Sequence, residues 1–106
     1  MQPQSFRWII VAIALCAMAT RAQAATIRIT METLVISPAE ASAKVGDTVE
    51  WVNKDVLAHT ATAQNGDFDV MLPPNKTGSF VLKKAGNIDY YCRFHPNMKA
   101  VLKIDR

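Results

Sequence analysis

The sequence predicts an all-β domain in which short strands pack as a sandwich or a small barrel. Apolar and polar residues alternate with a period of two in several segments, and turn-forming residues separate these segments at close spacing. No segment sustains a helical period, and only residues 39–44 are ambiguous. There is no internal repeat or low-complexity segment, so we expect a single domain.

The first predicted strand shows the alternation clearly, because Ile27, Ile29 and Met31 are apolar and the residues between them are polar. A second strand follows the turn at residues 45–47. Asn65-Gly66 is a strong hairpin signal. Including this second strand, the strands expected after the first cover residues 48–53, 58–63, 67–70, 79–83, 88–92 and 100–104.

The first 24 residues resemble a secretory signal peptide. Arg7 precedes an apolar run at residues 8–18, and Ala22-Gln23-Ala24 is a small-x-small cleavage signal. The run is about half the length that crosses a bilayer, so no stable membrane anchor is expected. We therefore predict cleavage after Ala24 and a single exported domain, residues 25–106, in the periplasm.

Charge provides little information about partners. The full chain carries +3, of which the predicted signal holds two charges through Arg7 and Arg21. The remaining basic residues are scattered, with only Lys83 and Lys84 adjacent. Nothing indicates a nucleic-acid partner, and we expect a monomer.

Removal of Cys16 with the signal would leave Cys92 as the single cysteine of the domain. Small exported domains normally pair their cysteines in disulfides. A single thiol is therefore an inert buried group, half of an intermolecular disulfide or a metal ligand. His95 and Met98 follow Cys92 at intervals of three residues, and the other histidine is His59.

Two imidazole nitrogens and a thiolate, with a weak axial thioether, form the ligand set of a blue-copper centre. Taken singly, a histidine or methionine more often belongs to the core or the surface, and we assign Met31 and Met71 to packing. The four residues in the order His…Cys-x-x-His-x-x-Met are far more specific. Zinc is the competing metal, with Asp55 or Asp69 as a possible fourth ligand. The expected copper ligands are His59, Cys92, His95 and Met98.

Strand parity supports this interpretation, because Ile88, Tyr90 and Cys92 face the same side of one strand, toward the core. Pro96 restricts the turn that follows. His59 belongs to a different strand, so it would connect this loop to the sheet.

These motifs resemble those of the small cupredoxins, and among them the amicyanin group. The similarity covers essentially all of residues 25–106 and is clearest in residues 45–53, His59, residues 85–92 and the loop from His95 to Met98. It implies a two-sheet Greek-key β-sandwich with one type 1 copper ion bound by the four ligands named above. It also implies that His95 reaches the surface through an apolar patch, for which the candidates are Leu72, Pro73, Phe94 and Pro96.

The chain departs from the amicyanin pattern near the site. Thr60 stands where the family usually has an asparagine that ties the two ligand loops together, and its hydroxyl could make part of that bond. Arg93-Phe94 replaces Thr-Pro, and Ala100 stands where glycine is common. An unscreened positive charge on Arg93 would favour Cu(I) over Cu(II).

The resemblance implies an electron shuttle that exchanges single electrons with transient redox partners, a dehydrogenase or a cytochrome. The alternative is a periplasmic protein for copper delivery or sequestration. A binding module with a free thiol would require the four-residue pattern to be accidental. We do not expect an enzyme, because no further histidines are present for a second copper site.

Overall fold

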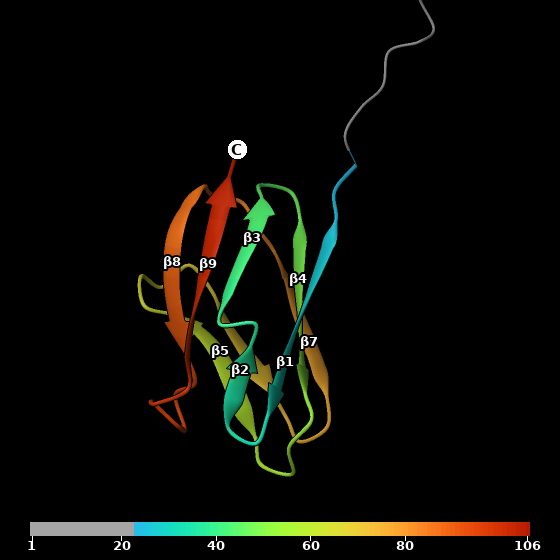
Figure 1. The fold of residues 1–106 in the computed structure, drawn as a ribbon, viewed down its shortest axis with the longest axis vertical. Coiled ribbons are helices and arrows are strands. Elements are labelled where there is room, and N and C mark those ends of the chain that lie inside the picture. Colours follow the sequence, from blue (N-terminus) through green and yellow to red (C-terminus); the bar gives the residue numbers. More distant parts are fainter. Residues whose placement is uncertain (1–22) are drawn as a thin grey trace, which may run out of the picture.

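The computed structural model describes residues 23–106, which form nine strands and no helix (Figure 1). The apolar run and most of the predicted signal lie outside the described residues. Residues 23–106 contain no helix that could cross a lipid bilayer. The strands are β1 (Thr26–Glu32), β2 (Val35–Ser37), β3 (Glu40–Lys44), β4 (Thr48–Asn53), β5 (His59–Ala63), β6 (Asp69–Leu72), β7 (Thr77–Val81), β8 (Gly86–Tyr91) and β9 (Lys99–Asp105).

The strands form two mixed sheets that pack face to face as a sandwich. One sheet has four strands in the order β2-β1-β4-β7, and the other has five in the order β3-β9-β8-β5-β6. The pairs β1–β4 and β3–β9 are parallel, and the other pairs are antiparallel. The predicted all-β, two-sheet Greek-key sandwich is confirmed, and the barrel alternative is wrong.

The predicted strands are present with small shifts at their ends. The strand after the Asn65-Gly66 turn begins at Asp69 instead of residue 67. The ambiguous residues 39–44 contain β3, whose buried residues are the small Ala41 and Ala43. The sequence did not reveal β2, because three residues are too few to show a period of two.

Aromatic side chains connect the two sheets in the core. Trp51 of β4 and Tyr90 of β8 are fully buried, and the indole Nε1–H donates to the Tyr90 hydroxyl at 3.2 Å. Their rings meet edge to face with centroids 5.7 Å apart, a favourable aromatic geometry. Burial raises the pKa of Tyr90 to about 12. Ile88 and Cys92 are also buried, so the predicted inward face of this strand is confirmed.

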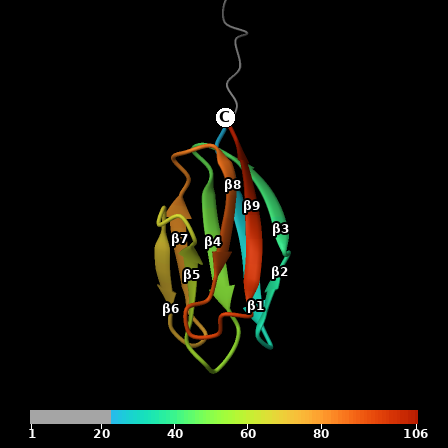
Figure 2. The ribbon, with the colours of Figure 1, turned by 90° about the vertical axis from the view of Figure 1, so that its left-hand side faces the viewer.

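Four connections lie together at the end of the sandwich opposite the C-terminus (Figure 2). They are the β1–β2, β4–β5, β6–β7 and β8–β9 connections, which bring residues far apart in the sequence to one end. The candidate metal ligands and their hydrogen-bond partners come from this end of the fold.

At the opposite end, Asp47 joins two segments through its carboxylate. Its Oδ1 accepts from the Ala25 N–H at 2.8 Å, and its Oδ2 accepts from the Lys44 N–H at 2.9 Å. These two hydrogen bonds lower the pKa of Asp47. A carboxylate whose pKa is lower in the folded chain contributes stability above its unfolded pKa. That contribution is lost as the pH falls through the folded pKa.

We therefore expect the free energy of unfolding of the metal-free protein to fall between about pH 5 and pH 2, and Asp47→Asn to reduce this dependence. Urea denaturation at a series of pH values measures it. Asp89→Asn removes an equal charge at an exposed position of β8 and is the matched control. An equal slope in the wild-type and Asp47→Asn proteins would contradict the prediction.

Candidate metal centre

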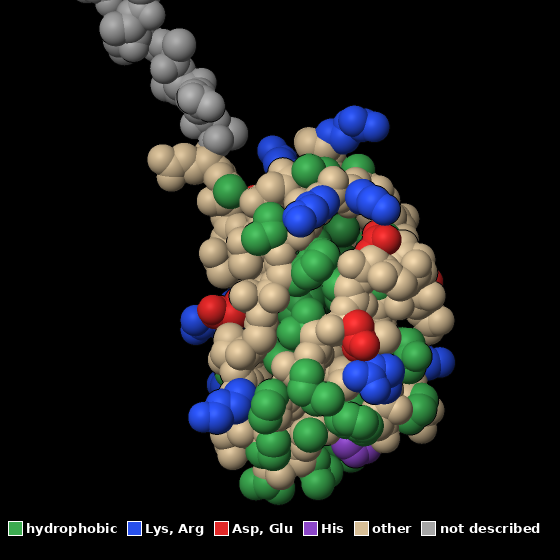
Figure 3. All heavy atoms as spheres, turned by 180° about the vertical axis from the view of Figure 1, so that it is seen from behind, with side chains coloured by type: hydrophobic (Ala, Val, Ile, Leu, Met, Phe, Trp, Pro, Cys, Tyr) green, Lys and Arg blue, Asp and Glu red, His purple; other side chains and the backbone are tan. Residues whose placement is uncertain are grey.

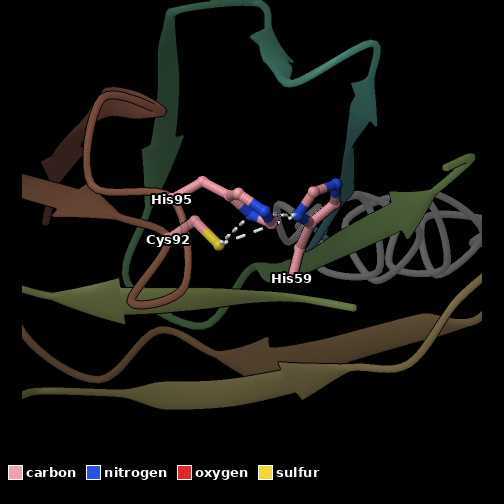
Figure 4. Close-up of side chains that lie close together, drawn as sticks. All are labelled: His59, Cys92 and His95. Carbon is pink, nitrogen blue, oxygen red and sulfur yellow. Dashed lines mark hydrogen bonds between the residues drawn. The ribbon is translucent and has the colours of Figure 1, made fainter. Parts of the chain in front are cut away.

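Three donor atoms from His59, Cys92 and His95 converge at the loop end of the sandwich (Figure 4). The two Nδ1 atoms are 3.2 Å apart. The Cys92 Sγ lies 3.7 Å from the Nδ1 of His59 and 3.6 Å from that of His95. Among His, Cys, Asp and Glu in residues 23–106, these three are the group that could hold a metal ion.

The triangle of donor atoms has the right size for a metal ion. A point equidistant from its three corners lies about 2.0 Å from each, as the three side lengths require. Zinc, an ion of comparable size, bonds to nitrogen at about 2.0–2.1 Å and to sulfur at about 2.3 Å. The donor set, two imidazoles and one thiolate in a trigonal arrangement, suits copper. These residues therefore fit a copper ion.

The ends of two neighbouring strands position His59 and Cys92. His59 is the first residue of β5, and Cys92 directly follows β8. Both are fully buried, whereas His95 is partly exposed. Because Cys92 has no exposed surface, it cannot form an intermolecular disulfide in the folded chain.

Backbone hydrogen bonds close the loop that carries Cys92, His95 and Met98. The His95 N–H donates to the Cys92 carbonyl at 3.2 Å, and the Met98 N–H donates to the His95 carbonyl at 2.8 Å. The Cys92 N–H then donates to the Met98 carbonyl at 3.1 Å. The Met98 side chain is buried at the end of this loop. Its role as the axial ligand remains a prediction.

Asp55 holds His59 from the side away from the ligand triangle. The Nε2 of His59 lies 2.8 Å from the Asp55 Oδ2. An ionised carboxylate can only accept, so Nε2 carries the proton and Nδ1 presents its lone pair toward Cys92 and His95. A carboxylate behind a ligating histidine fixes its tautomer and orientation and increases its basicity. The sequence suggested Asp55 only as a possible zinc ligand and did not predict this role, although Asp55 lies four residues before His59.

The same carboxylate stabilises the β1–β2 turn. Its Oδ1 accepts from the Thr33 N–H at 2.7 Å, and its Oδ2 accepts from the Leu34 N–H at 3.1 Å. Thr33 and Leu34 have φ values of 51° and 64°, a conformation that is costly for residues other than glycine. The hydrogen bond from His59 and those from Leu34 and Thr33 lower the pKa of Asp55. One side chain thus couples this turn to a metal ligand.

Thr60 joins the two segments that carry the candidate ligands. Its backbone N–H donates to the Cys92 Sγ at 3.4 Å, and its Oγ1 accepts from the Arg93 N–H at 2.8 Å. Thr60 therefore contacts both Cys92 and Arg93.

Neither carboxylate considered for a zinc site belongs to the ligand group. Asp55 contacts the outer nitrogen of His59, and Asp69 accepts hydrogen bonds from Thr62 and Arg93. The Arg93 Nε lies 3.1 Å from the Asp69 Oδ1, so the positive charge expected to favour Cu(I) has a counter-charge.

Apolar side chains, drawn in green, surround the histidine side chain drawn in purple at this end of the molecule (Figure 3). Phe94, Pro73 and Pro96 are exposed there as predicted. Leu72 was expected in this patch, but it is fully buried, so that prediction is wrong. Met71 was assigned to packing and is half exposed, whereas Met31 is buried as expected. Val56 and Leu57 in the β4–β5 connection are also exposed, which the sequence did not predict.

Fold and site together define a small copper-binding β-sandwich. A family described as "Cupredoxin-like domain" matches residues 6–104. The chain belongs to the cupredoxin family.

Within that family, the chain is similar to amicyanins. It is 29% identical to amicyanin of Paracoccus denitrificans over 72 residues, which is 62% of this chain and 55% of that protein. The chain therefore spans little more than half of the length of this relative. It is also 32% identical to the methylamine utilization protein MauL of Methylorubrum extorquens, with 80% of this chain and 78% of MauL covered.

The fold of this chain is also similar to solved structures of amicyanin. The amicyanin structure from Paracoccus versutus matches with a TM-score of 0.66 at 26% identity, covering 81% of this chain and 85% of that one. A variant of amicyanin in the reduced state matches with a TM-score of 0.66 at 27% identity, covering 76% and 82%.

Proposed function

We propose that this chain is a mononuclear blue-copper protein that carries single electrons between redox proteins. The observation that carries the proposal is the compact triangle of His59, Cys92 and His95, two of whose members are fully buried. Copper in such a site supplies a one-electron Cu(II)/Cu(I) couple. The proposal extends to a single type 1 ion with Met98 as the weak fourth ligand.

The surroundings of the ligands support electron transfer over copper handling. Asp55 holds the ring of His59, Thr60 donates to the Cys92 sulfur, and three backbone hydrogen bonds close the loop. Ligands held by the fold move little when the charge of the metal changes, which favours fast electron exchange. Delivery or sequestration of copper would favour exposed, adjustable ligands, and His59 and Cys92 are neither.

The apolar surface around His95 is the proposed docking site for transient partners. Phe94 and Leu57 lie in the β8–β9 and β4–β5 connections and are about half exposed, and Val56 is 80% exposed. A small surface of this kind supports weak encounters from which partners separate quickly. His95 is the partly exposed ligand and is therefore the proposed point of electron exit.

The names of the similar proteins suggest a metabolic process in which the redox partners of this chain act. Amicyanin and a methylamine utilization protein are both similar to this chain, so we propose redox partners in methylamine utilization. We further propose a periplasmic monomer, cleaved after Ala24, that acts as a carrier and not as an enzyme.

The visible spectrum of residues 25–106 with added Cu(II) tests the function. We expect an intense blue band that disappears on reduction and returns on reoxidation, with one copper ion per chain. A colourless protein that binds Cu(I) or zinc would indicate metal handling instead. Absence of metal binding would contradict the copper site itself.

Replacing Met98 with leucine tests the axial ligand. We expect Met98→Leu to keep the blue colour and to shift the reduction potential, because a weak axial ligand tunes the potential without being needed to hold the metal. Cyclic voltammetry measures the shift. Met71→Leu is the matched control, since that methionine is exposed on β6, and its potential should equal that of the wild type. Equal potentials in all three proteins would argue against Met98 as a ligand.

A further inference from the structure

A closed ring of hydrogen bonds lies beside the ligand triangle. The Arg93 N–H donates to the Thr60 Oγ1, which lies 2.8 Å from the Thr62 Oγ1. The Thr62 hydroxyl donates to the Asp69 Oδ1 at 2.7 Å, and the Arg93 Nε–H donates to the same oxygen at 3.1 Å. The ring therefore begins and ends on Arg93, the residue that follows Cys92.

Strand geometry assembles this ring. Thr60 and Thr62 are two residues apart on β5, so their side chains share one face of the sheet. Thr62 and Asp69 are directly opposite each other in the β5–β6 pair. Thr60 is fully buried, while Thr62 is partly exposed and Asp69 is exposed.

The direction of each hydrogen bond follows by elimination. Asp69 can only accept, because hydrogen bonds from Thr62 and then Arg93 lower its pKa and keep it ionised. The Thr62 hydrogen is thus directed to Asp69, so the Thr60 hydroxyl must donate to the Thr62 oxygen. Thr60 in turn accepts from the Arg93 N–H. All hydroxyls in the ring point the same way, toward the negative charge, and such chains strengthen each other.

We propose that Thr62 and Asp69 are positioning residues that hold the Cys92 sulfur through this ring and thereby set the reduction potential of the site. This inference rests on the proposed function. Within residues 23–106, neither side chain forms a hydrogen bond with a candidate metal ligand. They act through Thr60, whose backbone N–H donates to the Cys92 Sγ, and through Arg93, which is fixed at two points.

The ring and the charge of Asp69 affect the reduction potential in two separable ways. A hydrogen bond to the ligating sulfur withdraws electron density from it, which favours Cu(I) and raises the reduction potential. The ring keeps that bond in place. In addition, the Asp69 carboxylate supplies a negative charge close to Arg93, and a nearby negative charge favours Cu(II) and lowers the potential. Breaking the ring and removing the charge should therefore have opposite effects.

Amide hydrogen exchange tests the ring without any metal. In the metal-free protein, Thr62→Val removes the hydroxyl while preserving the shape and charge of the side chain. We expect the Arg93 amide to exchange up to about tenfold faster, as the loss of about one hydrogen bond predicts. Thr48→Val, at the far end of β4, is the matched control. Equal Arg93 exchange in the two variants would overturn the proposal.

Reduction potentials of the copper-loaded proteins separate the effect of the ring from the effect of the Asp69 charge. Thr62→Val should lower the potential and Asp69→Asn should raise it, each by at most about a tenfold change in the reduction equilibrium, or about 59 mV. Asparagine can still accept the Thr62 hydrogen, so it keeps the ring and removes only the charge. A Thr62→Val potential equal to that of Thr48→Val, or shifted upward, would overturn the proposal.

The proposed function can fail separately. A wild-type protein without a reversible blue band would contradict electron transfer, yet amide exchange would still decide whether the ring holds Arg93.

Discussion

Replacing Cys92 with serine is expected to abolish the intense blue absorption of the copper-loaded protein. That band requires a thiolate bonded to Cu(II), and a serine hydroxyl is a far weaker ligand. Cys92 contributes the sulfur corner of the ligand triangle, 3.6 and 3.7 Å from the two histidine nitrogens. We therefore also expect Cys92→Ser to lose most of its affinity for copper. Absorption spectroscopy with stoichiometric copper measures the colour, and a competing chelator measures the affinity.

The control must separate loss of the ligand from the cost of a buried hydroxyl. Ala63→Ser introduces the same group into β5, at a position that is 4% exposed and outside the ligand group. It should lower the free energy of unfolding by about 1–3 kcal/mol if the hydroxyl finds no partner, but it should remain blue. Intense blue colour in Cys92→Ser would refute the assignment of Cys92 as a ligand.

Replacing Asp55 with alanine is expected to weaken copper binding by about 10- to 100-fold, the usual effect of removing a carboxylate behind a ligating histidine. The Nε2 of His59 would lose its acceptor at 2.8 Å, so the proton could move to Nδ1 and block the metal-binding lone pair. Competition with a chelator of known affinity measures the change. NMR of the imidazole nitrogens in the metal-free protein reports which tautomer is present.

Asp89→Ala removes an equal charge from an exposed position of β8 and serves as the control. Its copper affinity and the tautomer of His59 should match those of the wild type. Asp55→Asn is the conservative variant, since its amide oxygen can still accept from Nε2, and it should restore part of the affinity. Equal affinities in Asp55→Ala and Asp89→Ala would show that the contact with His59 does not support metal binding.

The sequence predicted the strands and the ligand spacing because both are local properties. The strand predicted after the turn at residues 45–47 is β4, and the structure has it at the predicted residues, Thr48–Asn53. Cys92 and His95 are three residues apart on one short loop, so the fold could hardly separate them. The third donor was predictable for a different reason, since His59 was the other histidine of the chain and matched the family pattern.

The orientation of adjacent apolar residues could not be read from the sequence. Met71 and Leu72 are neighbours on β6, and a strand must place them on opposite faces. Only the pairing of β6 with β5, which puts Leu72 opposite His59, decides that Leu72 is buried and Met71 exposed.

The amino-acid sequence by itself thus determined that this protein is an all-β domain with two histidines and a cysteine suited to copper, and the arrangement in two sheets was decided by the structure. Tertiary structure alone decided how those ligands are held. Asp55 reaches back to the β1–β2 turn, more than twenty residues earlier, and Thr60 contacts Arg93 at a separation of 33 residues. Such contacts depend on strand pairing across the whole domain, whereas the ligand motif depends on spacing within a few residues.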